Sequence, residues 1–449
     1  MDTIAAISTA PGRAAIAVVR ASGSDVRTIA RDILGEKLPE RRPSLRWLTH
    51  PGTGDSVDQV LATFFPSPDS YTGEDMLELS CHGGPIAPQL VLDAVLAAGA
   101  RSAHPGEFTR RAYLNGKLDL LQAEAVLDLV DGRSAAQHRA AVHQLDRGLS
   151  RRIDELRDAI IHCEALTAYD IDFPEEDEGP VSAEAVEAAA LEIVRRIDRL
   201  LETASDGALL REGALTVIAG RPNAGKSSLL NALCGFERAI VTEEPGTTRD
   251  AVEVVVSLAG YPFRLVDTAG LRDSAGKVES IGIEVARRYL ASADVVLFCA
   301  EAGRPLSDEE AAFLNEIESG IVMRVRTKCD LRKASPPGAD VEVDPEIELS
   351  AVSGEGLADL RDRLVGRVFS GVLGGRGEEP LITRERHARD LRTARAEMEA
   401  FREARRTRVA PEVAATHLKA ATHALEELVG VVATDDLLGR VFSEFCVGK

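Results

Sequence analysis

Aromatic residues and long apolar runs are both scarce in this 449-residue sequence. Aromatics make up 4% of the chain and hydrophobic residues 45%, a balance typical of a soluble, helix-rich protein. No apolar stretch approaches the roughly 20 residues that a membrane-spanning helix needs. The first residues also lack the basic start of a secretory signal peptide. The sequence therefore predicts a protein that is neither membrane-spanning nor exported.

Cysteine is sparse as well, and basic residues are outnumbered by acidic ones. The six cysteines are scattered, with no Cys-x-x-Cys pair and no Cys/His spacing suited to zinc, so we expect a reduced, cytoplasmic setting. The formal net charge of −20 argues against a surface that binds nucleic acid over its whole extent, because phosphate contacts need Lys/Arg clusters. Any RNA contact must be local, and a solubilising acidic surface explains most of the charge.

Length and patterning predict several domains, since a domain takes roughly 150 residues. Residues 1–117 alternate short β-like runs with Gly/Pro turns, which indicates a small α+β domain. Residues 118–210 and 376–449 show helical spacing, whereas residues 211–375 alternate strands and helices. Helices on both sides suggest that the α/β domain is inserted into an all-α domain. A tandem arrangement is the alternative.

The α/β region begins with a phosphate-binding pattern. Residues 220–227, Gly-Arg-Pro-Asn-Ala-Gly-Lys-Ser, fit G-x-x-x-x-G-K-[ST], after a strand-like run at 215–219 and before a helix-like run from Ser228. The glycines let backbone N–H groups curl toward an anion, Lys226 brings positive charge to the β- and γ-phosphates, and Ser227 can ligate Mg²⁺. The pattern predicts a nucleoside triphosphate site.

Two further elements fit a switch that senses the γ-phosphate. Asp267-Thr268-Ala269-Gly270 follows the strand-like run 263–266, so Asp267 can support the Mg²⁺ shell and Gly270 can sense the phosphate. Residues 245–250, Pro-Gly-Thr-Thr-Arg-Asp, form a mobile loop that offers a threonine to Mg²⁺.

The guanine-recognition element is Thr327-Lys328-Cys329-Asp330, at the end of the β-rich run 321–326. Its aspartate can accept two guanine protons that adenine cannot offer, so we expect GTP in preference to ATP. Ser350-Ala351-Val352 supplies backbone for the guanine oxygen. Together these elements resemble a Ras-like GTPase of the translation-factor-related kind. Such GTPases usually begin this element with Asn, whose amide ties the base and the phosphate loop together. Because the Thr327 hydroxyl can replace only part of that bonding, we expect weaker nucleotide affinity and a retained guanine preference.

Blocks outside this region carry a second resemblance. They are Thr3-Ile4-Ala5-Ala6-Ile7, residues 71–85, Pro105-Gly106-Glu107-Phe108, Asn115-Gly116-Lys117-Leu118-Asp119-Leu120, Ile171-Asp172-Phe173-Pro174-Glu175-Glu176 and Phe445-Cys446-Val447-Gly448-Lys449. In combination they are similar to the MnmE (TrmE) family of tRNA modification GTPases, over essentially the whole chain. Because the similarity begins at residue 3, we expect no organelle presequence and a bacterial cytoplasmic protein.

This resemblance implies a fold and a reaction. The fold is multidomain: an α+β N-terminal folate-binding domain that dimerises, an all-α helical domain in two parts, and an inserted α/β Ras-like P-loop GTPase domain. The homodimer works with the FAD-dependent MnmG, in a heterotetramer or larger complex, to add an aminomethyl or carboxymethylaminomethyl group to the 5-position of wobble uridines in tRNA. A 5-formyl- or 5,10-methylene-tetrahydrofolate supplies the one-carbon unit.

Motif matching carries the resemblance to single residues. The folate contacts implied are Arg20, Glu78, Lys117 and Lys449: Arg and Lys can meet the tail carboxylates, and Glu can accept paired pterin N–H groups. Taken singly, each is an ordinary surface charge. Cys446 has two interpretations, a small packed hydrophobe or a redox or covalent role beside folate.

The resemblance also implies how GTP is split. Leu271 stands where Ras-like switches place a water-orienting glutamine, and in the family GTPase-domain dimerisation and a bound K⁺ supply the missing stabilisation. The K⁺ ligands implied are the Asn223 side chain and the carbonyls of Thr242, Glu244 and Thr247; the Mg²⁺ ligands are Ser227 and Thr248. Glu279 orients the attacking water through a second water.

The implied site is therefore large. The residues expected to act in hydrolysis are Glu279, Thr248 and Asp267. The residues expected to contact GTP are Asn223, Ala224, Gly225, Lys226, Ser227, Ser228, Thr242, Glu243, Glu244, Pro245, Gly246, Thr247, Thr248, Asp267, Thr268, Ala269, Gly270, Thr327, Lys328, Asp330, Ser350, Ala351 and Val352.

Two other functions are alternatives. A ribosome-assembly GTPase switch of the Era/Der kind shares the GTPase elements but lacks the N-terminal blocks and the terminal motif. A folate-binding module with a decayed GTPase is supported only by Thr327, while Lys226, Ser227, Asp267 and Asp330 argue that hydrolysis survives.

Overall fold

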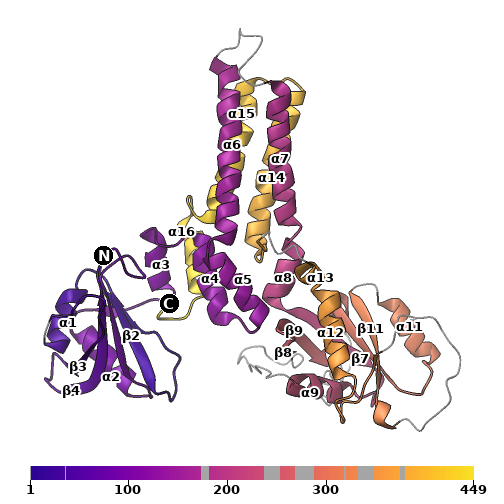
Figure 1. Ribbon diagram of the computed structural model, residues 1–449, viewed down its shortest axis with the longest axis horizontal. Helices are drawn as coiled ribbons and strands as arrows, with labels where there is room; N and C mark the ends of the chain where they lie inside the picture. The colour runs from indigo at the N-terminus through magenta and orange to yellow at the C-terminus, as the bar shows by residue number, and fades with distance from the viewer. Residues whose placement is uncertain are drawn as a thin grey trace, which may run out of the picture. The chain divides into compact units, whose positions relative to one another are not determined.

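A computed structural model describes residues 2–35, 37–172, 182–236, 253–267, 288–317, 320–331, 347–374 and 380–449 (Figure 1). The chain forms two units. The first contains Met1–Leu127, Gln144–Arg157 and Thr422–Lys449, and the second contains Asp128–His143 and Asp158–Ala421. Each unit brings together segments that are far apart in the sequence.

The first unit is built on a mixed six-stranded sheet with strand order β3-β4-β5-β2-β1-β6. Its strands are β1 (Ile4–Ile7), β2 (Ile16–Ser22), β3 (Ser44–Thr49), β4 (Ser56–Phe65), β5 (Met76–His82) and β6 (Arg101–Ser102). Neighbouring strands are antiparallel except β1 and β6. Helices α1 (Val26–Leu34) and α2 (Ala87–Ala97) pack on one face, where alternate residues of β2, Ala17 and Val19 among them, are buried.

The C-terminal end of the chain belongs to the same unit. Helices α3 (Glu107–Leu114), α4 (Leu120–Asp131) and α16 (Asp435–Ser443) follow the sheet or close the chain. An apolar cluster of Leu120, Phe442 and Phe445 joins α4 to the terminal residues. The Tyr113 hydroxyl also donates a hydrogen bond to the Gly430 carbonyl. The terminal segment is therefore anchored near the first sheet.

The second unit contains another six-stranded sheet, in the order β12-β11-β10-β7-β9-β8 and parallel except for the β8/β9 hairpin. Its strands are β7 (Ala214–Gly220), β8 (Glu253–Leu258), β9 (Tyr261–Asp267), β10 (Val295–Glu301), β11 (Ile321–Thr327) and β12 (Ile347–Glu348). Helices α9 (Lys226–Phe236) and α12 (Leu357–Val368) cover one face of β7, and α11 (Asp308–Glu316) covers the other. β7 is consequently buried on both faces.

Helices from before and after this sheet in the sequence pack together. α7 (Ala183–Leu201) and α14 (Glu385–Arg406) are joined by the ion pairs Asp198–Arg395 (2.5 Å) and Glu187–Arg402 (2.7 Å). The other helices are α5 (Ala135–Leu145), α6 (Gly148–Asp172), α8 (Ala204–Glu212), α13 (Ser370–Leu373) and α15 (Pro411–Val429), with the short 3-10 turn η1 (Cys329–Leu331). Among the described residues, no helix is both long and apolar enough to cross a bilayer.

These elements confirm the predicted fold class of α+β, all-α and α/β parts. The strand-like runs 215–219, 263–266 and 321–326 lie within β7, β9 and β11. The domain boundaries drawn from the sequence stay predictions.

Candidate functional site

The predicted phosphate loop begins where β7 ends. Gly220 has a φ of 141°, and a Cβ there would overlap the carbonyl oxygen of Cys299 on the neighbouring strand β10. Asn223 and Gly225 also have positive φ, at 61° and 83°. Positive φ at three positions of one short loop bends the backbone so that its N–H groups can face an anion.

Lys226 lies beneath this loop at the start of α9 and is 6% exposed. Its Nζ donates to the carbonyl oxygens of Gly220 (3.0 Å) and Arg221 (2.8 Å). A buried ammonium group needs such oxygen partners, and phosphate oxygens are equivalent ones. The side chain is thus placed to serve the predicted phosphate site.

Ser227 and Asp267 meet beside Lys226. Parallel pairing of β7 with β9 sets Asp267 opposite Ile218, and Ser227 Oγ donates to Asp267 Oδ2 at 2.6 Å. Hydroxyl and carboxylate oxygens are the ligands that Mg²⁺ prefers, so the donor set fits that ion. The third predicted oxygen donor, Thr248, lies outside the described residues.

The Thr327 hydroxyl ties the guanine element to the phosphate loop. Thr327 is 2% exposed, and its Oγ1 donates to the Ala224 carbonyl at 2.7 Å, with the Ala300 carbonyl farther away at 3.2 Å. One hydroxyl carries one proton, so the bond to Ala224 is the stronger. The Thr327 hydroxyl therefore joins the guanine element to the phosphate loop, as part of the bonding that an asparagine amide makes in similar GTPases.

The remaining predicted guanine contacts lie in two adjacent turns. Asp330 is exposed in η1, and the Cys329 N–H donates to the Leu349 carbonyl at 3.2 Å. This bond brings η1 beside the turn that begins at Ser350, whose hydroxyl accepts the N–H of Val352 at 3.2 Å. The fold thus groups the base-recognition residues predicted from two separate motifs.

Several predicted residues lie outside the part of the chain that the structure describes, and their roles stay predictions. They are Thr242, Glu243, Glu244, Pro245, Gly246, Thr247, Thr248, Thr268, Ala269, Gly270 and Glu279.

A second polar site lies on the first sheet. Arg20 and Glu78 are direct cross-strand neighbours on β2 and β5, and their side chains form an ion pair of 2.7 Å. The Arg20 guanidinium lies 5.5 Å from the centroid of the Tyr71 ring and 5.8 Å from that of Phe108. Paired charges beside aromatic rings suit a flat, polar heterocycle.

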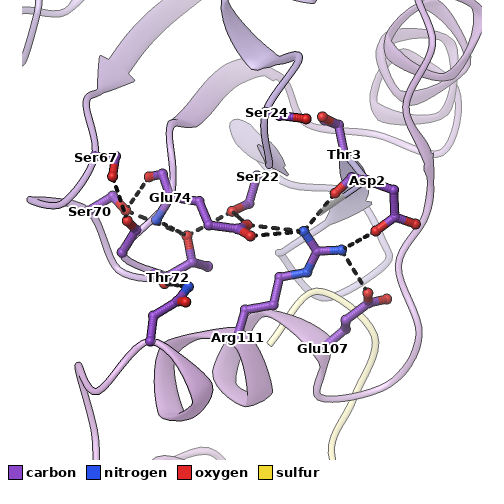
Figure 2. A network of polar contacts seen from close by, with 12 residues as sticks. Asp2, Thr3, Ser22, Ser24, Ser67, Ser70, Thr72, Glu74, Glu107 and Arg111 are labelled. Atoms are coloured by element: carbon purple, nitrogen blue, oxygen red, sulfur yellow. Dashed lines mark hydrogen bonds and ion pairs between the residues drawn. The ribbon is translucent and has the colours of Figure 1, made fainter.

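The buried Arg111 organises a polar network in the same unit (Figure 2). Its guanidinium donates to Asp2 (2.8 Å), Glu74 (3.0 Å) and Glu107 (3.0 Å), and Ser22 Oγ donates to Glu74 at 2.8 Å. The network joins the start of the chain, α3 and the connection between β4 and β5. Sequence analysis missed it because Glu74 and Asp2 are 37 and 109 positions away from Arg111; the only local signal was the spacing of Glu107 and Arg111.

The same network keeps Glu107 ionised. Burial opposes its ionisation, but hydrogen bonds from the Arg101 side chain, the His104 N–H and the Arg111 side chain outweigh burial and lower the pKa to about 2. Glu107 is therefore ionised at neutral pH.

The terminal segment closes onto this region. The Lys449 carbonyl accepts the Phe108 N–H at 3.2 Å, and the Gly448 carbonyl accepts the Ser8 hydroxyl at 3.0 Å. Gly448 has a φ of 96°, and a Cβ there would overlap the Ile7 carbonyl oxygen. Glycine thus allows the close approach of the chain's last residues to β1.

Phe108 connects three of the four predicted folate residues. Its ring lies beside Arg20, the partner of Glu78, and its N–H is bonded to Lys449. The fourth, Lys117, donates from Nζ to the Pro68 carbonyl at 3.1 Å, in the β4–β5 connection that also carries Tyr71.

The exposure of Cys446 contradicts one of its two predicted roles, that of a small packed hydrophobe. Its side chain is exposed, because Phe445 and Gly448 occupy the buried positions of the terminal segment. The packed-hydrophobe interpretation is wrong, and a redox or covalent role stays a prediction.

Comparisons with known proteins cover nearly the whole chain. Residues 3–117 match the family described as GTP-binding protein TrmE N-terminus, and residues 120–446 match the MnmE helical domain. The tRNA modification GTPase MnmE of Ralstonia nicotianae is 44% identical over 99% of this chain and 96% of its own length. The tRNA modification GTPase MnmE of Sodalis glossinidius is 43% identical over 100% of this chain and 99% of its own length.

A solved structure of the G domain of the T. maritima FeoB iron transporter is 31% identical, with a TM-score of 0.25, and covers 33% of this chain and 95% of that one. The match to residues 3–117 argues against an assembly GTPase, which lacks that region. From the family matches and the full-length relatives, we conclude that the chain belongs to the MnmE family of tRNA modification GTPases, enzymes that hydrolyse GTP.

Proposed function

We propose that this chain is a K⁺-stimulated GTPase that acts with the FAD-dependent MnmG to add an aminomethyl or carboxymethylaminomethyl group to the 5-position of wobble uridines in tRNA. Family membership supports the class of reaction. The phosphate loop, with Lys226 buried beneath it and Ser227 bonded to Asp267, is the observation that carries the GTPase part.

Mg²⁺ would be held by Ser227 and Thr248, with Asp267 behind Ser227. The 2.6 Å bond between Ser227 and Asp267 supports this, since it brings together a hydroxyl and a carboxylate oxygen, both of them oxygen ligands suited to Mg²⁺. Bound there, Mg²⁺ would neutralise charge on the β- and γ-phosphates. The chain's own task is to orient the nucleotide through the loop N–H groups and Lys226.

K⁺ would be held by the Asn223 side chain and by carbonyls of Thr242, Glu244 and Thr247. The left-handed Asn223 lies at the bend of the loop, where a side-chain oxygen can face the phosphates. Bound there, K⁺ would replace part of an arginine finger, which is worth about 10³–10⁵ in rate. Because Leu271 cannot orient water, Glu279 takes that role in this proposal.

A tetrahydrofolate would bind beside Arg20 and Glu78. The ion pair, the two aromatic rings and the approach of Lys449 to Phe108 fit a pterin with a carboxylate tail. Bound folate supplies a one-carbon unit. Glu78 would accept pterin N–H groups, and Lys117 and Lys449 would meet the tail. Arg20 would orient Glu78 instead of meeting the tail as expected from the sequence, because its guanidinium is paired with that carboxylate.

The partners in this proposal are a second copy of the chain, MnmG and tRNA, in the cytoplasm. GTP hydrolysis would drive opening and closing of paired GTPase domains instead of the modification chemistry itself. This division of labour places the one-carbon chemistry in the first unit and the switch in the second.

Reconstitution tests the proposal. The purified chain, MnmG, unmodified tRNA, GTP, methylene-tetrahydrofolate and glycine or ammonium are combined in KCl, and nucleosides are measured by mass spectrometry. We expect 5-aminomethyl-type uridines in KCl, few in NaCl and none without folate. Equal GTP turnover in the two salts would refute the K⁺ part, and product without folate would refute the folate part.

A further inference from the structure

Arg221, inside the phosphate loop, has its side chain bound to another element. Its Nη2 donates to the Ser307 hydroxyl at 2.6 Å and to Glu309 Oε2 at 2.8 Å. Its Nε lies 3.6 Å from Glu310 Oε1. All three partners lie at the start of α11, which follows β10, so the guanidinium spans from the loop to a separate helix.

The start of α11 is a firm anchor. Ser307 and Glu310 form a capping box: Ser307 Oγ accepts the Glu310 N–H at 3.3 Å, and Glu310 Oε2 accepts the Ser307 N–H at 2.8 Å. Glu310 is 3% exposed and is also paired with Arg304 at 2.7 Å. A helix end with satisfied N–H groups and a buried carboxylate has little freedom to move.

The backbone carbonyl of Arg221 also makes hydrogen bonds within the fold. Its carbonyl accepts the Lys226 ammonium at 2.8 Å and the Ala224 N–H at 3.2 Å. Arg221 therefore links α11, through its side chain, to Ala224 and Lys226, through its carbonyl. A shift of Arg221 would move both of them.

We propose that Arg221 is a positioning residue for the phosphate loop, which it holds in its binding conformation by anchoring the loop to the N-terminus of α11. The loop cradles the β-phosphate of GTP and of GDP alike, so the anchor contributes equally to binding both nucleotides. An interaction of this kind changes KM and leaves kcat nearly unchanged.

The test compares Arg221→Ala and Arg221→Lys with a matched arginine. Affinity for GTP and for GDP is expected to fall about 10-fold in Arg221→Ala, with kcat at saturating GTP within about twofold. Arg221→Lys, which keeps a charge but reaches fewer acceptors, should recover about half of that loss on a logarithmic scale.

The matched control is Arg264→Ala. Arg264 has a carbonyl partner, Gly213 (3.2 Å), and a carboxylate partner, Glu253 (3.5 Å), and is 31% exposed against 37% for Arg221. It does not contact the loop, so nucleotide affinity should stay unchanged.

A double-mutant cycle with the partner helix identifies the anchor. Glu309→Ala alone should weaken binding about twofold, and Arg221→Ala/Glu309→Ala should be no weaker than Arg221→Ala alone. Unchanged GTP and GDP affinity in Arg221→Ala, with or without a lower Tm, would overturn the proposal. Fully additive losses in the double variant would overturn the assignment of α11 as the anchor.

Discussion

The two six-stranded sheets present their candidate sites in different ways. In the second unit the site lies at the carboxyl end of the parallel strand β7, where a glycine-containing loop offers backbone N–H groups to an anion. In the first unit it lies on the face of a mixed sheet, where Arg20 and Glu78 stand side by side. There the site is completed by residues from the opposite end of the chain.

The difference teaches what each site depends on. A loop site depends on local backbone conformation and on the few side chains that hold the loop. A face site depends on contacts between segments far apart in the sequence. Substitutions should therefore separate the two sites, and each prediction below concerns one site or the unit that carries it.

The largest effect is expected from Glu279→Ala. In the proposed mechanism Glu279 orients the attacking water, so its loss should lower kcat for GTP by about 10²–10⁴-fold. Affinity for GTP should be nearly unchanged, and affinity for folate should not change at all. Single-turnover hydrolysis and binding of a fluorescent GTP analogue measure the two quantities; a parallel loss of binding would remove Glu279 from its assigned role.

Gly220→Ala should break the loop site. The added methyl group overlaps the Cys299 carbonyl in a backbone conformation that L-residues avoid. Strain of about 3 kcal/mol should weaken GTP binding about 100-fold. The control is Gly235→Ala in α9, where a Cβ meets nothing within 4 Å and binding should be unchanged. Tight GTP binding by Gly220→Ala would contradict the loop geometry.

Gly448→Ala is the matching change at the face site. Its methyl group overlaps the Ile7 carbonyl, so the terminal segment should move away from β1 and Phe108. Folate affinity, measured by calorimetry, should fall about 10-fold while GTP turnover is retained. Gly439→Ala in α16, with open space around its Cβ, is the control. Unchanged folate affinity in Gly448→Ala would show that the terminal segment is not part of the site.

Glu107→Gln should expose the acid dependence of the first unit. The pKa of Glu107 is about 2, below its ordinary value of 4.5. Its ionised form therefore stabilises the fold fully above about pH 4.5, and this stabilisation is lost as the pH falls toward 2. At neutral pH the variant should lose about 2 kcal/mol in free energy of unfolding, and the difference should vanish near pH 2. Urea unfolding followed by the fluorescence of Trp47, the single tryptophan, measures it. A difference that stays constant from pH 7 to pH 3 would contradict this account.

Thr327→Val should give the smallest effect. It leaves the Ala224 carbonyl without its donor, which should cost about 1 kcal/mol of GTP affinity, or about fivefold. Thr327→Ser keeps the hydroxyl and should bind like the parent. Preference for GTP over ATP should persist in both, because Asp330 is unchanged. Competition binding with GTP and ATP measures this preference. A loss of the preference for GTP in Thr327→Val would mean that Thr327 itself contacts the base.

The loop site was largely predictable because its residues are contiguous. Residues 220–227 imply a strand, a glycine turn and a helix through local backbone rules, and β7 and α9 bear this out. The parallel order of the strands also made it reasonable to place Asp267 near Ser227.

The contacts that complete both sites were not predictable. The bonds of Arg111 to Asp2, of Phe108 to Lys449 and of Arg221 to Ser307 join residues whose spacing follows no local period. Such contacts arise from tertiary packing, and the same charged residues are compatible with an ordinary exposed surface. The Thr327–Ala224 bond was anticipated only as a partial substitute for an asparagine amide.

The central claim is that both sites serve one tRNA modification. Nucleoside mass spectrometry of bulk tRNA, from cells with and without this gene, tests it most directly, with the gene restored as parent, Gly220→Ala or Glu78→Gln. We predict that 5-aminomethyl-type wobble uridines vanish without the gene, return with the parent and stay low with either variant. Unchanged uridines in the deletion strain would contradict the claim.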